Sequence, residues 1–257
     1  MLFAGIDVGS TTSKCVLLRG SEIAGSALVD MGVGTAGPEL AYSRALDEAG
    51  AGPEDVARCA ATGYGRAAWK GADLTVSELT AHGLGNRFLF PQARTVIDIG
   101  GQDAKVIQLD AGGRMANFVM NDKCAAGTGR FLEVMANVLR IPIGELGALA
   151  AQAERIAPIS STCTVFAESE VISQLANGVP VPDVVAGICQ SVAVRVAALA
   201  RRGGVREAVF MSGGVARNAG VRRALEEDLG VTLHTSELSQ MAGALGAAIY
   251  GFQKMIQ

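Results

Sequence analysis

Two aspartates each follow a short apolar run and precede a polar turn that contains glycine. The first is Asp7 in FAGIDVGSTTSK, and the second is Asp98 in VIDIGGQDAK. Glycine lets backbone N–H groups approach phosphate oxygens, and an aspartate can hold Mg²⁺, usually through water. A single turn of this kind is common and has little specificity. Two turns at matching positions favour a site for a nucleotide polyphosphate.

The two segments align without gaps at an offset of 91 residues (98 minus 7), which pairs Asp7 with Asp98 and Lys14 with Lys105. An offset of this length indicates an internal duplication of a whole domain. We therefore predict two related domains, at residues 1–93 and 94–257, each opening with a strand, a turn and a second strand.

The turns supply the candidate site residues. Phosphate-binding candidates in the first turn are Gly9, Ser10, Thr11, Thr12, Ser13 and Lys14, and Lys14 could alternatively be solvated. The second turn offers Gly100 and Gly101. An amide or carboxylate beside a terminal phosphate can orient the attacking water. Gln102, with its neighbour Asp103, is therefore a catalytic candidate together with Asp7 and Asp98.

Around these hairpins the pattern of apolar residues predicts alternating helices and strands, an α/β protein. We expect a turn over 158–170. Strands are expected near 55–65, 208–213 and 231–235, and helices near 37–50, 76–89, 130–139, 145–156, 171–178, 192–202, 216–230 and 239–252.

Composition excludes several kinds of protein. The 257 residues carry 22 Lys and Arg against 25 Asp and Glu, without basic runs, and only 5% are aromatic, so the sequence predicts no nucleic-acid binding. The apolar stretch 192–202 is interrupted by Arg195 and is expected to be too short to span a membrane. The N-terminus lacks the charged region of a signal peptide, which predicts a cytoplasmic protein.

The five cysteines are an odd number and include no C-x-x-C pair. In a chain without an export signal, such cysteines are better interpreted as thiols or metal ligands than as disulfides. Cys124 precedes a glycine-rich helix start and Cys163 also precedes a helix, where unpaired N–H groups favour an anionic group. We interpret the other three as structural, namely Cys15, Cys59 and Cys189.

Three segments, IDVGSTTSK, IDIGGQDAK and FMSGGVARN, resemble the two phosphate segments and the adenosine segment of the actin, sugar kinase and heat-shock chaperone superfamily of ATPases. The resemblance implies two duplicated ribonuclease-H-like domains with ATP or ADP in a cleft between them. It implies that Gly213 and Gly214 approach adenosine and that Arg217 contacts the nucleotide, with Gln240 a weaker candidate. A plain strand–helix turn is the alternative for Gly213 and Gly214.

Within that superfamily, NDKCAAGTGRFLE and STCTVFAESEVI resemble the activating ATPases (component A) of 2-hydroxyacyl-CoA dehydratases and the related ATPase subunits of benzoyl-CoA reductases. The resemblance implies a homodimer with one [4Fe-4S] cluster on its two-fold axis, held by Cys124 and Cys163 of each chain. Such a cluster takes four thiolates, which fits two chains giving two cysteines each.

Two further segments, TGYGR at 62–66 and SELTAH at 77–82, also resemble segments of this family, but their residues indicate no chemistry. Glu78 and His82 are four residues apart on one helical face. Without a third ligand in view, we interpret them as structural.

The function that the resemblance implies is ATP-dependent activation. The protein would take an electron from ferredoxin or flavodoxin and pass it to an iron–sulfur 2-hydroxyacyl-CoA dehydratase, with hydrolysis of Mg²⁺-bound ATP. An ATPase subunit of a benzoyl-CoA reductase or other double-cluster reductase is one alternative. Sugar or acid kinases share the fold but give no reason for the cysteine segments, and a filament or chaperone ATPase would need a polymer interface or a peptide-binding extension.

Overall fold

The computed structural model describes residues 1–160 and 163–255, which form two compact units. The first unit contains residues 1–93, residues 109–115 and the chain from Leu238 onward. The second unit contains residues 94–108 and 116–237. Each unit is built on its own five-stranded sheet.

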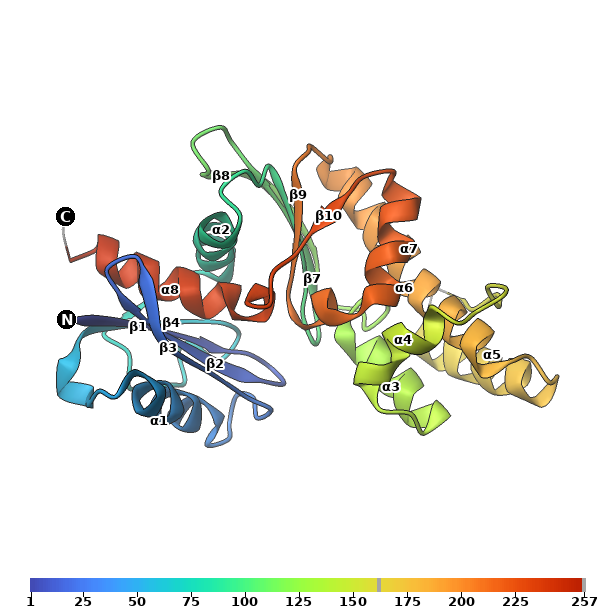
Figure 1. The fold of residues 1–257 in the computed structure, drawn as a ribbon, viewed down its shortest axis with the longest axis horizontal. Coiled ribbons are helices and arrows are strands. Elements are labelled where there is room, and N and C mark those ends of the chain that lie inside the picture. The colour runs from blue at the N-terminus through green and yellow to red at the C-terminus, as the bar shows by residue number, and fades with distance from the viewer. Residues whose placement is uncertain (161–162, 256–257) are drawn as a thin grey trace. The chain divides into compact units, whose positions relative to one another are not determined.

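The first unit has the strand order β3-β2-β1-β4-β5, of which Figure 1 labels β1, β2, β3 and β4. Successive residues of a strand point to opposite faces of a sheet. Ile6 of β1 accordingly packs with Ala41 of α1, whereas Phe3 packs with Leu245 of α8 on the opposite face. The elements are β1 (Leu2–Val8), β2 (Ser13–Arg19), β3 (Glu22–Val29), α1 (Gly37–Ala49), η1 (Pro53–Asp55), β4 (Val56–Thr62), β5 (Leu74–Thr75), α2 (Glu78–Leu89), η4 (Ser239–Met241) and α8 (Ala242–Gln253).

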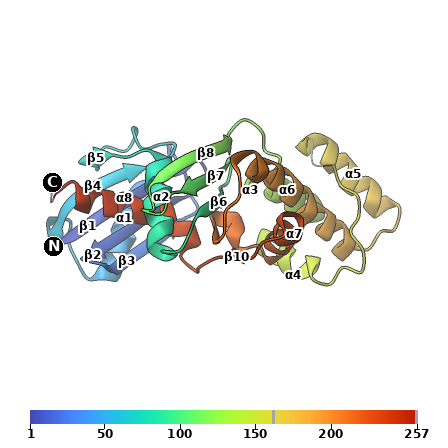
Figure 2. The ribbon, with the colours of Figure 1, turned by 90° about the horizontal axis from the view of Figure 1, so that it is seen from above.

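The second unit has the strand order β10-β9-β6-β7-β8, and Figure 2 shows β6, β7 and β8 side by side. Ile97 of β6 and Val106 of β7 share a buried core with Val192 of the long helix α6. The elements are β6 (Thr95–Ile99), β7 (Ala104–Leu109), β8 (Met115–Asn121), α3 (Gly129–Leu139), η2 (Ile143–Glu145), α4 (Leu146–Ala150), α5 (Thr164–Ala176), α6 (Val181–Gly203), β9 (Val209–Ser212), η3 (Gly214–Arg217), α7 (Ala219–Leu229) and β10 (Leu233–His234).

The duplication predicted from the sequence is confirmed by the two sheets. In each, the first strand pairs antiparallel with the second strand and parallel with the fourth. The register places Asp7 opposite Lys14 in one sheet and Asp98 opposite Lys105 in the other. Both turns are closed by the same backbone hydrogen bond, from Gly9 N–H to the Thr12 carbonyl at 3.0 Å and from Gly100 N–H to the Asp103 carbonyl at 2.9 Å.

The last helix belongs to the first unit, whereas the sequence assigns residues 94–257 to the second domain. Helix α8 packs so closely on β1 that a Cβ on Gly5 would overlap the backbone of Ala244. It packs equally closely on α2, where a Cβ on Gly246 would overlap the carbonyl of Ala81. Glycine and alanine are absent from most periodicity arguments, so the sequence pattern did not show where this helix packs.

Two predicted elements differ from those observed near the second cysteine. The predicted helix over 145–156 ends at Ala150, because the Asp183 carboxylate accepts the N–H groups of Glu154 and Arg155 and draws that segment to α6. The predicted turn over 158–170 is wrong in its second half, where α5 begins at Thr164. Only two of its residues, Ala167 and Val171, are buried, which leaves a weak helical pattern.

Helix α6 is 23 residues long, and by length and composition it could cross a membrane. The expectation of a short apolar stretch is therefore wrong. However, 72% of its most apolar window is buried inside the protein, as in the core helix of a folded domain.

Candidate nucleotide site and cysteine loops

Asp7 and Lys14 form an ion pair across the first hairpin. Lys14 Nζ lies 3.2 Å from Asp7 Oδ2, and the two side chains are 12% and 10% exposed. Lys14 is therefore held against the aspartate, which contradicts the solvated alternative. In the turn, Thr11 is exposed and Ser10 and Thr12 are half-buried. Ser13 lies in β2, fully buried, and donates its hydroxyl to the Met31 carbonyl at 2.7 Å.

The carboxylate of Asp7 is enclosed by the two segments that the sequence left without chemistry. After β4, Gly63 packs against Asp7 so closely that a Cβ would overlap Oδ1. From α8, a Cβ on Gly243 would lie 3.1 Å from Asp7 Oδ2 and 3.0 Å from Nε2 of the buried His82. Segments 62–66 and 77–82 thus shape the surroundings of this aspartate.

Thr62 adds a second feature beside Asp7. It is the residue in register with Asp7 on the neighbouring parallel strand, and its side chain is fully buried. Its Oγ1 has no hydrogen-bond partner among the described residues. Buried hydroxyls are nearly always hydrogen-bonded in folded proteins, so this position fits an additional polar group or water beside the Asp7 carboxylate.

Asp98 lies deeper than Asp7, at 1% exposure. Ser212 of β9 donates its hydroxyl to Asp98 Oδ2 at 2.6 Å, and Lys105 Nζ lies 3.8 Å from Oδ1. Lys105 also forms an ion pair with Asp103 of the turn. In this hairpin the lysine therefore lies between two carboxylates.

The second turn connects directly to helix α3. The N–H of Gly129 donates to the Gly100 carbonyl at 2.8 Å, and that of Arg130 donates to the Gly101 carbonyl at 2.7 Å. The sequence predicts unpaired N–H groups at the start of this helix, which would favour an anionic group near Cys124. That prediction is wrong, because the carbonyls of the turn accept hydrogen bonds from these N–H groups. Gln102, between the turn and β7, is exposed.

The predicted adenosine segment lies at the end of β9. Gly213 has φ +82°, and a Cβ there would overlap the Ile99 carbonyl, so glycine is required for this approach of β9 to β6. The following residues open into a pocket of about 460 Å³, a volume usual for small-molecule sites. Its lining comprises Ala216, Arg217, Arg222, Thr235, Ser236 and Glu237.

Arg217 therefore lines a pocket, as the adenosine interpretation requires, whereas Gly214 is exposed in η3 and lies outside the lining. Gln240 also lies outside it, half-buried in η4 of the first unit. Sequence reasoning missed Thr235, Ser236 and Glu237, which follow β10. A polar run after a predicted strand was the available signal.

The two candidate cluster cysteines are both half-buried. Cys163 is the N-cap residue of α5, and its side chain makes no capping hydrogen bond. Cys124 lies in the loop before α3, where its carbonyl accepts from Asn121 Nδ2 at 2.9 Å. Residues 161 and 162, which open the STCTVFAESEVI segment, lie outside the described part of the chain.

Both cysteine loops rest on neighbouring turns of α6. Three residues before Cys163, the Ser160 carbonyl accepts from Ser191 Oγ at 2.9 Å. Three residues after Cys124, Gly127 lies against Arg195, whose Cγ would be 2.8 Å from a Cβ at that position. Residues four apart in a helix lie on the same face, so Ser191 and Arg195 hold the two loops side by side.

The other three thiols are buried, as predicted. Burial raises the pKa of Cys189 to about 12, and burial with the nearby Asp73 carboxylate raises the pKa of Cys59 to about 12. Burial also raises the pKa of Cys15 well above its usual value. These thiols remain protonated at neutral pH and pack as small apolar groups.

A family model described as the BadF/BadG/BcrA/BcrD ATPase family matches residues 4–251. Over 252 residues the chain is 56% identical to the "(R)-2-hydroxyglutaryl-CoA dehydratase activating ATPase" of Acidaminococcus fermentans, covering 97% of this chain and 96% of the relative. The crystallised "Activator of the 2-Hydroxyisocaproyl-CoA Dehydratase from Clostridium difficile with bound ADPNP" superposes with TM-score 0.96 at 48% identity, covering 99% of this chain and 95% of that one.

A more distant structure bears on the fold alone. A ROK family glucokinase from Streptomyces griseus superposes with TM-score 0.58 at 15% identity, covering 98% of this chain and all of the glucokinase. The predicted fold, a duplicated α/β architecture like that of a sugar kinase, is thereby confirmed.

Proposed function

The chain belongs to the BadF/BadG/BcrA/BcrD ATPase family, and from that premise we propose that it activates a 2-hydroxyacyl-CoA dehydratase by ATP-dependent electron transfer. The electron donor is ferredoxin or flavodoxin, and the acceptor is the iron–sulfur dehydratase in the cytoplasm. Chemistry on the acyl-CoA belongs to the dehydratase, so this chain supplies the coupling of ATP hydrolysis to electron delivery.

The observation that carries the proposal is the connection between the second phosphate turn and the helix after Cys124. Gly100 and Gly101 hold the first two N–H groups of α3 with their carbonyls. A phosphate bound at this turn acts on the same peptide groups. Movement of the turn between nucleotide states therefore shifts the start of α3 and the Cys124 loop before it, which links the two functions within one unit.

ATP is bound through the turns. In the first unit, the backbone N–H groups and hydroxyls of Ser10, Thr11 and Thr12 bind phosphate oxygens, and Lys14 adds a positive charge. Ser13 serves through its backbone, since its hydroxyl is engaged with Met31. In the second unit, the glycines of the turn bind phosphate and Gln102 orients the attacking water. Gly213 and Gly214 place the backbone at adenosine, and Arg217 packs on it from the pocket of the second unit.

Asp7 and Asp98 are the candidate ligands of Mg²⁺. Asp7 fits this role, since it keeps some exposure and lies beside the unpartnered Thr62 hydroxyl, which leaves a polar position for a hydrated cation. Asp98 is already compensated by Lys105 and Ser212, so its contribution to the cation is through water. When bound, Mg²⁺ would neutralise charge on the phosphates.

Cys124 and Cys163 are the candidate ligands of a [4Fe-4S] cluster, which stores and passes single electrons when bound. Among the described residues, no three His, Cys, Asp or Glu side chains are grouped as a metal site requires. Each chain offers two candidate thiolates, which is half of a four-thiolate set. A second copy completes it across a homodimer interface.

Helix α5 supports the placement of that interface. Directly after Cys163, Val165 and Phe166 are 67% and 65% exposed, and Ile172 is 53% exposed two turns later. Large apolar side chains gathered on one exposed helix indicate a protein contact. Burying them against the partner's copy brings the two Cys163 residues toward each other.

The cluster is tested by iron content and mass in solution. Anaerobically purified protein should run as a dimer with about four iron atoms per dimer. Cys124→Ser and Cys163→Ser should each lose the iron, whereas the buried Cys189→Ala control keeps it. Four iron atoms in each isolated monomer would contradict the bridging arrangement.

The activation itself is tested by reconstitution. Reduced protein and ATP should switch on an inactive 2-hydroxyacyl-CoA dehydratase, and a non-hydrolysable ATP analogue should not sustain repeated activation. Phosphorylation of a sugar or carboxylic acid, with no effect on a dehydratase, would instead support a kinase. Activation of benzoyl-CoA reduction alone would support the reductase alternative.

A further inference from the structure

Helix α6 carries three arginines in its C-terminal half, and they have different surroundings. Arg201 forms an ion pair with Asp228 and also donates to the Asp228 carbonyl. The side chains of Arg195 and Arg202 form neither a hydrogen bond nor an ion pair with any residue in the described part of the chain. They are seven residues apart, which is two helical turns, so they lie on the same face of α6.

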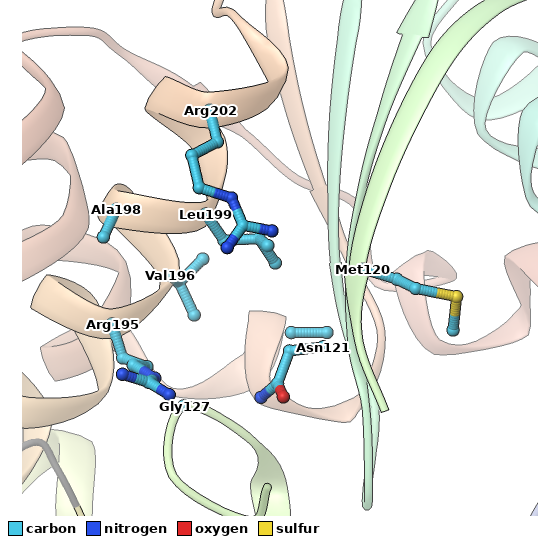
Figure 3. A pocket seen from close by; sticks show the side chains of 9 residues that line it. Met120, Asn121, Gly127, Arg195, Val196, Ala198, Leu199 and Arg202 are labelled. Atoms are coloured by element: carbon cyan, nitrogen blue, oxygen red, sulfur yellow. The ribbon is translucent and has the colours of Figure 1, made fainter. Parts of the chain in front are cut away.

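Both arginines line one pocket of about 170 Å³ in the second unit. Figure 3 shows their guanidinium groups in the space between α6 and Asn121 of β8. The other lining residues are apolar or glycine, namely Ala104, Met120, Gly127, Val196, Ala198 and Leu199. The pocket therefore has two positive charges, one amide and no carboxylate.

The size of the pocket limits its ligand. A water molecule needs roughly 10–15 Å³ of such volume, so 170 Å³ holds a polyatomic group and is below the usual range for drug-sized ligands. Guanidinium groups bind carboxylates and phosphates in paired, charge-assisted hydrogen bonds. We propose that this pocket is a binding site for a compact oxyanion, a phosphate or carboxylate group, held by Arg195 and Arg202.

The pocket touches the loop that carries Cys124. Gly127 of that loop has φ +83° and lies under the Arg195 stem, so no side chain fits between them. Asn121 lines the pocket and donates its amide to the carbonyls of Cys124 and Ala126, at 2.9 and 3.2 Å. An anion that orders Arg195 and Asn121 therefore also orders this loop, whether or not the loop holds a cluster.

Two sources share this chemistry, a free anion and the acidic side chain of a docking protein. Inorganic phosphate and a hexaglutamate peptide are titrated separately into the full-length protein at low ionic strength by calorimetry. Arg195→Gln and Arg202→Gln should each weaken binding by about ten- to a hundredfold. The Arg201→Gln control, adjacent in sequence but paired with Asp228, should leave it unchanged.

The variant Lys14→Ala distinguishes phosphate binding in this pocket from phosphate binding at the nucleotide turn. The affinity for phosphate at the first hairpin should be lowered by Lys14→Ala and not by the α6 variants. Phosphate binding sensitive to Arg195 and Arg202 supports a free anion as ligand, and peptide binding alone with that sensitivity supports an acidic protein segment. Equal affinity of the parent protein and both arginine variants for both probes would overturn the proposal.

Discussion

The two hairpins share a backbone but differ in their electrostatics. In the first, Lys14 has one carboxylate partner, Asp7, and both side chains remain partly exposed. In the second, Lys105 is 3% exposed and contacts both Asp98 and Asp103, while Ser212 donates to Asp98. The same aspartate–lysine pair has therefore been kept near the surface in one repeat and buried within the core of the other.

This difference separates a group that can respond to a ligand from one that is fully engaged by the protein. The Asp7–Lys14 pair keeps about a tenth of each side chain exposed, so the lysine can exchange the carboxylate for a phosphate when one arrives. A buried pair cannot be broken without leaving a charge uncompensated. The second hairpin thus acts through its turn, which holds α3, rather than through its lysine.

Replacing each lysine by methionine should give the largest contrast. Lys105→Met leaves the carboxylate of Asp98 buried without its cation and should cost about 3 kcal/mol of unfolding free energy. Lys14→Met should cost less than this, because Asp7 keeps some contact with water, and should mainly weaken ATP binding. Urea unfolding and nucleotide titration measure the two effects. Equal losses of stability would show that the hairpins are electrostatically alike.

Gly243→Ala tests whether the enclosure of Asp7 matters for hydrolysis. The new methyl group would press on Asp7 and His82, each about 3 Å away. Displacement of a positioning group by about 1 Å can cost a hundredfold, so kcat should fall by up to about that factor, with a smaller change in KM for ATP.

The matched control is Gly251→Ala on the same helix, where the new Cβ would make an ordinary contact of 3.6 Å with Ala60. It should keep its ATPase rate. A Gly243→Ala protein that unfolds at the parent's urea concentration yet hydrolyses ATP at the parent's rate would remove the enclosure from the mechanism.

Thr11 and Gln102 occupy equivalent positions in the two turns, but their substitution should change different kinetic parameters. Gln102→Ala should lower kcat about tenfold, because it is proposed to orient water. Thr11→Ala should raise KM for ATP about fivefold with kcat nearly unchanged, since it is proposed to bind phosphate in ground and transition states alike. Steady-state kinetics of both variants decides this, and a shared KM effect would assign Gln102 to binding.

How much of the molecule the sequence could predict depends on the kind of contact. The repeat at Asp7 and Asp98 predicted two equivalent hairpins, because the two segments align without gaps. The packing of α8 on β1 and on α2 could not be predicted, because it rests on the missing side chains of Gly5 and Gly246. The role of Gly100 and Gly101 at α3 was also hidden, since it uses backbone carbonyls, which every residue has.

The smallest effect is expected at Cys15, whose position in the first sheet is equivalent to that of Val106 in the second. Cys15 lies opposite Ile6 in the first hairpin, as Val106 lies opposite Ile97 in the second. Because burial raises the pKa of the Cys15 thiol, it is protonated and packs as an apolar group. Cys15→Val should therefore lower the free energy of unfolding, measured in urea, by less than about 1.5 kcal/mol and leave ATPase activity unchanged.

Iodoacetamide at about pH 8 should label Cys124 and Cys163 of the native, iron-free protein and should label Cys15 only after unfolding. Labelling of native Cys15, or loss of ATPase activity in Cys15→Val, would mean that this thiol contributes more than packing and that the two hairpins differ inside the sheet as well as at their turns.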